Sequence, residues 1–121
     1  MKYGVIFGAI LCSSMISGQV LAQNECAAGN TVEGGVLTIA TGNPAYFPWV
    51  IDDAPESKQG FEAAVAYAVA NQMGYSDDQV VWTRTGFDEA IQPGAKNFDL
   101  NMQQYSITAN RDEVVDFSAP Y

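Results

Sequence analysis

The sequence VLTIAT, residues 36–41, contains β-branched or apolar residues at nearly every position. A short apolar run without alternation is typical of a strand that is covered on both faces of its sheet. The sequence GNP, residues 42–44, follows directly and predicts the end of this strand. We therefore predict a buried strand at the centre of the fold, with the other segments arranged around it.

The next segment has the pattern of a helix. Residues 60–74 are rich in alanine, and Gly74 is a natural stop for a helix. Apolar side chains recur at three- and four-residue spacing, so one stripe of this helix is expected to face the core. The stripe consists of Phe61, Ala64, Val65, Ala68, Val69 and Met73.

Two further strands are predicted at residues 79–84 and 98–102, which are short and largely apolar. Between them, residues 87–92 predict a short helix that Thr85 caps, with Asp88 as its partner in a capping box. The order strand, helix, strand, helix, strand indicates an α/β fold with a mostly parallel sheet and flanking helices.

Charge and composition exclude several classes of function. The chain has 5 basic and 14 acidic residues, for a net charge of -9, whereas nucleic acids and anionic membranes need clustered Lys and Arg. It has no histidine, which excludes Ser-His-Asp catalysis and the common zinc sites within this chain. Asp52, Asp53 and Glu56 lack the spacing of a calcium loop and are expected to face solvent. We expect neither a metal nor another cofactor.

Residues 1–22 have the pattern of a secretory signal peptide. Lys2 supplies a positive start, residues 5–15 are mostly apolar, and the sequence VLA, residues 20–22, suits cleavage after about Ala22. The alternative is a retained membrane anchor, but the apolar run is shorter than the roughly 20 residues that a spanning helix needs. We therefore expect export from the cytoplasm without stable membrane insertion.

Residues 23–35 are polar and glycine-rich, and we expect them to form the N-terminal tail of the mature chain. Cys12 leaves with the signal peptide, so Cys26 remains alone. A lone cysteine in an exported protein either pairs with a cysteine outside the chain or lies in a mobile tail. Neither alternative predicts a redox role.

The segment after the first strand, AYFPW at residues 45–49, is unusually aromatic for a loop. Large aromatic residues at the carboxyl end of a strand often line a pocket. The alternative is that Phe47 and Trp49 fill the core. The hydroxyl group of Tyr46 suits the rim of a pocket better than a core.

The sequence NMQQYSITANRDEVVDFSAPY, residues 101–121, places Arg111 behind two hydroxyl side chains, Ser106 and Thr108. In a chain with few cations, this arginine is a candidate for holding an anion. From these residues alone, Arg111 could equally form a surface ion pair with a neighbouring acid, and both hydroxyls could serve in a turn or a helix cap. The neighbouring acids are Asp112, Glu113 and Asp116.

Five ordered segments together resemble the first half of a family 3 solute-binding protein, the periplasmic amino-acid-binding component of a bacterial ABC importer. The segments are LTIATGNPAYFPWV, GFEAAVAYAVA, FDEAI, FDLNMQQYSITANR and VDFSAPY. The resemblance covers residues 36–121. It implies a periplasmic-binding-protein-like lobe of type II, in a protein whose two α/β lobes close over an amino acid.

The resemblance also implies roles for single residues. Arg111 matches the arginine that clamps the α-carboxylate of the ligand, and its planar fork suits the two carboxylate oxygens. Ser106 matches a residue that holds the same carboxylate. The backbone carbonyl of Gln104 matches the acceptor for the α-ammonium group, and Tyr46 matches an aromatic residue that packs on the ligand side chain.

Two other positions of the pattern are expected to be structural. Asp99 matches a recurrent acid at the start of a strand, and Thr108 is expected to cap the helix that carries Arg111. Gln103 and Gln104 stand where many family members have small residues, so their side chains narrow the pocket or add hydrogen bonds. These positions leave the identity of the amino acid open.

The resemblance implies that residues 36–121 form only part of the first lobe. The second lobe and the segment that completes the first lobe are absent from this sequence, so we expect a fragment that binds ligand weakly or not at all by itself. The expected partners are a small-molecule ligand and an ABC permease, with the protein acting as a monomer. The alternatives are an enzyme on the same scaffold, similar to cyclohexadienyl or arogenate dehydratase, or the ligand-sensing domain of a receptor.

Overall fold

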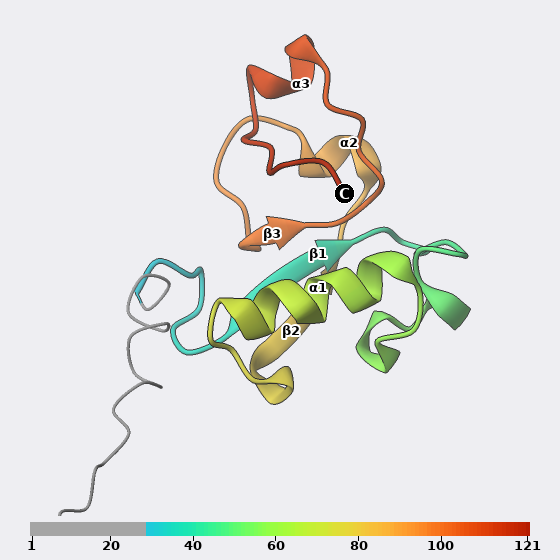
Figure 1. Cartoon of the computed structure of the whole chain (residues 1–121). Coiled ribbons are helices and arrows are strands. Elements are labelled where there is room, and N and C mark those ends of the chain that lie inside the picture. Colours follow the sequence, from blue (N-terminus) through green and yellow to red (C-terminus); the bar gives the residue numbers. More distant parts are fainter. Residues whose placement is uncertain (1–28) are drawn as a thin grey trace, which may run out of the picture.

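The computed structural model describes residues 29–121, which form a three-stranded parallel sheet with flanking helices (Figure 1). The strands lie in the order β2-β1-β3. The strands and α-helices are β1 (Leu37–Thr41), α1 (Phe61–Gln72), β2 (Val80–Arg84), α2 (Phe87–Ala90), β3 (Leu100–Asn101) and α3 (Ala109–Asp112). The 3-10 helices span Ile51–Asp53, Pro55–Ser57 and Asp77–Gln79. The predicted α/β class and parallel sheet are confirmed.

Strand β1 is the centre of the sheet, as its apolar sequence predicts. All five of its residues are buried. It pairs in parallel with β2 along its whole length, from Leu37 opposite Val80, and with β3 through Ile39 opposite Leu100. Each neighbouring strand is reached by a crossover connection, because parallel strands cannot be joined by a tight turn.

Helix α1 packs on one face of this sheet, but not through the predicted stripe. Ala66 and Ala70 lie against Leu37 and Ile39 in the main core. The buried residues of the helix are Glu62, Ala63, Ala66, Tyr67 and Ala70. Of the predicted stripe, Val65 and Met73 are partly buried at the edge of this core. The other members, Phe61, Ala64, Ala68 and Val69, are exposed.

The reason for this error is that α1 is apolar almost all the way round. The spacing of apolar residues is then compatible with burial of more than one helix face. Packing against the sheet determines which face is buried. Alanine lets the helix axis approach the sheet more closely than valine or phenylalanine would. The same choice buries the carboxylate of Glu62, which is 1% exposed.

The predicted cap of the second helix is wrong by one residue. Gly86 precedes α2 at the cap position, and its N–H donates to Oε2 of Glu89 at 3.1 Å. Thr85 is instead held by the sheet, since its N–H donates to the carbonyl of Thr41 at 3.0 Å. The helix also ends at Ala90 rather than at the predicted residue 92.

Strand β3 is shorter than predicted, and Asp99 anchors its start. The N–H of Asp99 donates to the carbonyl of Thr38 at 2.8 Å. Its carboxylate accepts from the N–H groups of Thr38 and Val32, both at 2.7 Å. Asp99 is therefore structural, as predicted, and it ties the segment before β1 to the sheet. The predicted signal peptide, Cys12 and Cys26 lie outside the described residues.

Candidate ligand-binding site

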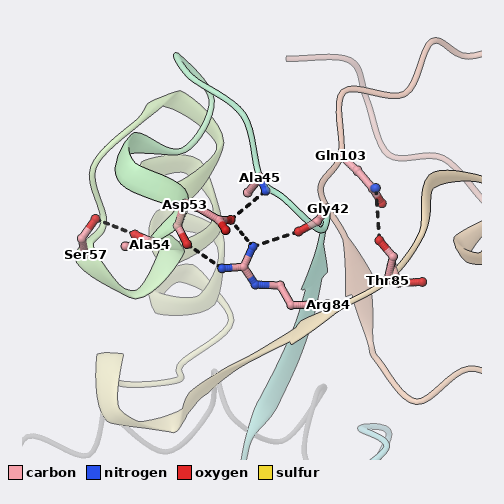
Figure 2. A network of polar contacts seen from close by, with 8 residues as sticks. All are labelled: Gly42, Ala45, Asp53, Ala54, Ser57, Arg84, Thr85 and Gln103. Carbon is pink, nitrogen blue, oxygen red and sulfur yellow. Dashed lines mark hydrogen bonds and ion pairs between the residues drawn. The ribbon is translucent and has the colours of Figure 1, made fainter.

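The carboxyl ends of the three strands are tied together at one edge of the sheet. The N–H of Met102 donates to the carbonyl of Ala40 at 2.9 Å, and the bond between Thr85 and Thr41 joins β2 to β1. Nε2 of Gln103 reaches the carbonyl of Thr85 at 3.4 Å (Figure 2). The segments that follow the strands therefore start side by side, at the edge where open α/β sheets bind ligands.

The loop after β1 is held by an arginine at the end of β2 (Figure 2). Nη1 of Arg84 donates to Oδ1 of Asp53 at 2.5 Å and to the carbonyl of Gly42 at 2.9 Å, and Nη2 donates to the carbonyl of Asp53 at 2.6 Å. Oδ1 of Asp53 also accepts from the N–H of Ala45 at 2.7 Å. The bond from Ala45, followed by that from Arg84, lowers the pKa of the Asp53 carboxyl.

Asp53 faces solvent, as predicted, but the sequence did not indicate its ion pair with Arg84. Its carboxylate is at the surface, but it makes a structural ion pair that fixes the aromatic loop. Asp52 and Glu56 are exposed, as predicted. Between residues 29 and 121, no group of three or more acidic or cysteine side chains is arranged to hold a metal ion.

Within the aromatic loop, the three large side chains have different environments. Tyr46 is 62% exposed and Phe47 is 78% exposed, so neither fills the core. Trp49 is half-buried, and its ring lies edge-on to Phe61 at 6.0 Å between centroids. The side chain of Tyr46 makes no aromatic contact or hydrogen bond with any described residue.

The segment after β3 turns sharply at Gln104, which has a positive φ of 55°. Its N–H donates to Oε1 of Glu62 at 2.8 Å, and its side-chain amide donates to Oε2. The hydroxyl of Tyr121 donates to Oε1 of the same carboxylate at 2.7 Å. Glu62 is not among the predicted ligand-binding residues, because an acid in the first turn of a helix is ordinarily explained by the helix dipole.

Arg111 lies on α3, and its side chain contacts a nearby carbonyl group and two aromatic rings. Its Nη1 donates to the carbonyl of Ser106 at 2.9 Å. Its guanidinium carbon lies 5.3 Å from the ring centre of Phe87 and 5.6 Å from that of Tyr105. The two rings are stacked on each other at 4.2 Å, and the hydroxyl of Tyr105 donates to the carbonyl of Phe87. The aromatic pair forms a platform for the cation.

No carboxylate of the described chain neutralises Arg111. The ion pairs found between residues 29 and 121 are Lys58–Asp77 and Arg84–Asp53. The alternative that Arg111 pairs with an acid of its own segment is therefore not what the structure contains. Thr108 caps α3 as predicted, with Oγ1 accepting from the N–H of Arg111 at 3.4 Å.

Burial and charge also act on the platform itself. Burial raises the pKa of the Tyr105 hydroxyl to about 12, while the nearby charge of Arg111 acts in the opposite direction. The phenol therefore stays neutral at physiological pH, and its ring stays available to the cation. Ser106 is exposed beside it.

Two pockets among the described residues lie at opposite ends of the strands. One of about 220 Å³ lies next to the Gln104 turn, and its walls include Trp49, Glu62, Gln104, Tyr105 and Tyr121. A larger one of about 680 Å³ lies at the opposite end of the strands, beside Leu37 and Asp99. The predicted residues Gln104, Ser106 and Arg111 gather at the first end and Tyr46 lies in the neighbouring loop, so we place the candidate site there.

Within residues 29–121, the fold and the candidate site define an α/β lobe in which an arginine without an acidic partner lies near the carboxyl edge of the sheet. The chain belongs to the bacterial extracellular solute-binding proteins, family 3. The model of this family matches residues 37–121. The family is described by solute binding outside the cell.

A relative in this family is an octopine-binding periplasmic protein of Rhizobium meliloti. It is 30% identical over 115 residues, which cover 93% of this chain and 35% of the relative. The chain therefore spans about a third of the length of the relative it matches. No solved structure gives a significant match. Among residues 29–121, no helix has the length and apolar character to cross a membrane.

Proposed function

We propose that this chain forms part of the first lobe of a periplasmic binding protein that delivers an amino acid, or a derivative with a free carboxylate, to an ABC permease. Residues 36–121 supply the carboxylate-binding part of the cleft, and the protein acts as a monomer. The observation that carries the proposal is the guanidinium of Arg111, which is fixed in place and has no acidic partner within residues 29–121.

A carboxylate is the group that such a guanidinium fits best. Nη1 is anchored to the carbonyl of Ser106, and the aromatic platform supports the plane of the group. The remaining N–H groups can meet two carboxylate oxygens in parallel, which a lysine cannot do. The exposed hydroxyl of Ser106 lies on the same segment and is proposed as a second donor.

Gln104 and Tyr46 are proposed to complete the contacts on this side. The carbonyl of Gln104 is proposed to accept from the ligand ammonium group. Tyr46 is proposed to pack on the ligand side chain, which suits its exposed ring at the end of the loop that Arg84 fixes. The name of the relative extends the ligand class from free amino acids to amino-acid derivatives such as octopine.

An enzymatic function on this scaffold finds less support. Glu62 is the acid closest to the proposed site in the bond network, but it is 1% exposed and accepts hydrogen bonds from Gln104 and Tyr121. A carboxylate held in this way is poorly available as a general base. The family match and the name of the relative also point to binding rather than catalysis.

The proposal is tested by calorimetry on the 121-residue chain with millimolar concentrations of the twenty amino acids and of octopine. We expect detectable heat for a ligand with a free α-carboxylate and none for the same ligand with that carboxylate converted to a carboxamide. Arg111→Lys should weaken binding about tenfold or more, because the paired bonds are lost, and Arg111→Met should abolish it. The matched control is Asp112→Asn, which removes a neighbouring exposed charge. Binding that persists unchanged in Arg111→Met would overturn the proposal.

A further inference from the structure

Glu62 is a buried carboxylate with neutral partners. It is 1% exposed, and its oxygens accept from the N–H of Gln104, the side-chain amide of Gln104 and the hydroxyl of Tyr121. None of the ion pairs found between residues 29 and 121 includes it. Burying a charge without a cation is costly unless strong hydrogen bonds compensate for the lost water. The location of those hydrogen bonds therefore indicates the role of the residue.

We propose that Glu62 is a positioning residue of the ligand site: it fixes the backbone turn at Gln104 and, through that turn, the segment that holds the Arg111 guanidinium. The consequence for ligand affinity rests on the proposed function, whereas the structural coupling does not.

The backbone of Gln104 has an unfavourable conformation. A φ of 55° in a residue other than glycine places the backbone in the left-handed region, which is unfavourable for L-residues. Such a conformation persists where the surroundings over-determine it. The bonds from the backbone and the side chain of Gln104 to one carboxylate supply that constraint, because both must be satisfied together.

The residues that follow Gln104 contact the side chain of Arg111. Tyr105 follows the turn and places its ring on Phe87 at 4.2 Å, under the guanidinium. Ser106 comes next, and its carbonyl accepts from Nη1 of Arg111 at 2.9 Å. A rotation of the backbone at Gln104 would move both the platform and this acceptor. Glu62 is therefore coupled to Arg111 through three consecutive residues.

A different role for Glu62 would be purely electrostatic. An acid in the first turn of α1 also stabilises the helix through its dipole, wherever the carboxylate points. Aspartate serves that role as well as glutamate, whereas glutamine does not. The positioning role has the opposite requirement, since it needs an acceptor at the full length of the glutamate side chain and can use a neutral one.

Two conservative variants of the 121-residue chain separate these roles. Glu62→Gln removes the charge but keeps the length and one acceptor oxygen for the N–H of Gln104. Its NH2 group can donate to the side-chain oxygen of Gln104 once that amide is turned over. Glu62→Asp keeps the charge but withdraws the oxygens by one methylene. The readouts are the hydrogen-exchange protection of the Gln104 amide and the ring-current shift of the Arg111 side-chain protons, both measured by NMR. The amides of Ile39 and Ala66 report on the integrity of the core.

We expect Glu62→Asp to reduce the protection of the Gln104 amide about tenfold or more and to weaken the ring-current shift of Arg111, with the core amides unchanged. Glu62→Gln should stay close to the wild-type chain in both readouts. Glu56→Gln and Glu56→Asp at an exposed acid serve as controls. The reverse pattern, in which aspartate preserves the signals and glutamine loses them, would overturn the proposal, as would signals that both variants leave intact.

The effect of Glu62 on ligand affinity is measured separately from the NMR readouts. Where the wild-type chain binds an amino acid, Glu62→Asp should weaken binding about tenfold and Glu62→Gln only slightly. A wild-type chain that binds no carboxylate ligand would contradict the proposed function of this chain. The Gln104 and Arg111 signals would still decide the positioning role in that case.

Discussion

Two arginines at the same edge of the sheet have different surroundings, and this difference decides which of them can meet a ligand. Arg84 donates to the Asp53 carboxylate and to the carbonyl of Gly42, so its hydrogen bonds serve the loop. Arg111 donates to one carbonyl, that of Ser106, and otherwise rests on aromatic rings. The first arginine is a structural clamp, and the second is free to hold an anion.

The structural clamp predicts a pH dependence of stability. The hydrogen bonds from Ala45 and Arg84 lower the pKa of Asp53 below its ordinary value of 3.8. The charged form therefore stabilises the fold above that value, and the contribution is lost as the pH falls through the lower pKa of the folded state. Asp53→Asn should lower the melting temperature at pH 7, and the difference from the wild-type chain should shrink in acid.

The matched control for this prediction is Asp52→Asn. Asp52 is the neighbouring exposed acid and also has a positive φ, so it reports on the general effect of replacing an acid in this loop. Thermal melting followed by circular dichroism between acid and neutral pH measures both variants. A difference between Asp53→Asn and the wild-type chain that stays constant with pH would contradict the assignment of this ion pair.

At the scale of elements, the backbone at the start of α1 is tightly constrained. Gly60 precedes the helix with a φ of 105°. A Cβ atom there would lie 2.7 Å from the carbonyl carbon of Trp49 and 2.7 Å from Cα of Val50, so it would collide with backbone. The N–H groups of Phe61 and Glu62 donate to the carbonyls of Pro48 and Trp49, which brings the aromatic loop against the helix.

Gly60→Ala should therefore destabilise the chain by roughly 2 kcal/mol or more, because both the backbone conformation and the backbone contacts oppose a side chain. Gly34→Ala is the control, since a Cβ atom at Gly34 meets nothing within 4 Å. Urea unfolding of both variants measures the free energy. Equal stability of the two variants would contradict the close approach of loop and helix.

The elements also show what the sequence can and cannot predict. The apolar run of β1 predicts its buried, central place because such a run is typical of a strand covered on both faces. The buried face of α1 could not be predicted, since the helix is apolar nearly all round. The cap of α2 was misplaced because the backbone of Thr85 continues into the sheet, a contact that depends on β1 and not on the local sequence.

In the candidate site, the contact predicted correctly is one between residues close together in the sequence. Thr108 caps the helix that carries Arg111, as its position in the sequence indicates. The bond between Glu62 and Gln104 could not be foreseen, because it joins residues that are 42 positions apart and depends on which face of α1 is buried. The ligand-binding roles of Tyr46, Gln104, Ser106 and Arg111 remain predictions.

At the scale of the whole molecule, residues 29–121 are proposed to supply one side of a ligand-binding cleft. In the structure, α2, α3 and the end of the chain gather beyond β3, while α1 lies along the sheet (Figure 1). The candidate site lies at this edge and is open to solvent at Ser106. A small ligand that is covered on one side keeps most of its contact with water, so its binding is weak.

This arrangement predicts the affinity of the chain. Calorimetry with the twenty amino acids should give dissociation constants well above the micromolar range for the 121-residue chain. The physical reason is that few contacts are made against the cost of immobilising the ligand. Micromolar binding would show that the described residues enclose a ligand by themselves and would contradict the view that they supply one side of the cleft.

The central claim is that Arg111 holds a carboxylate, and one measurement tests it most directly. The guanidinium signals of Arg111 are followed by NMR while the chain is titrated with L-phenylalanine and, separately, with phenethylamine, which lacks the carboxylate. We predict that the amino acid shifts the Arg111 signals in a saturable way and that the amine leaves them unchanged. Equal shifts with both compounds, or shifts confined to residues away from Arg111, would contradict the claim.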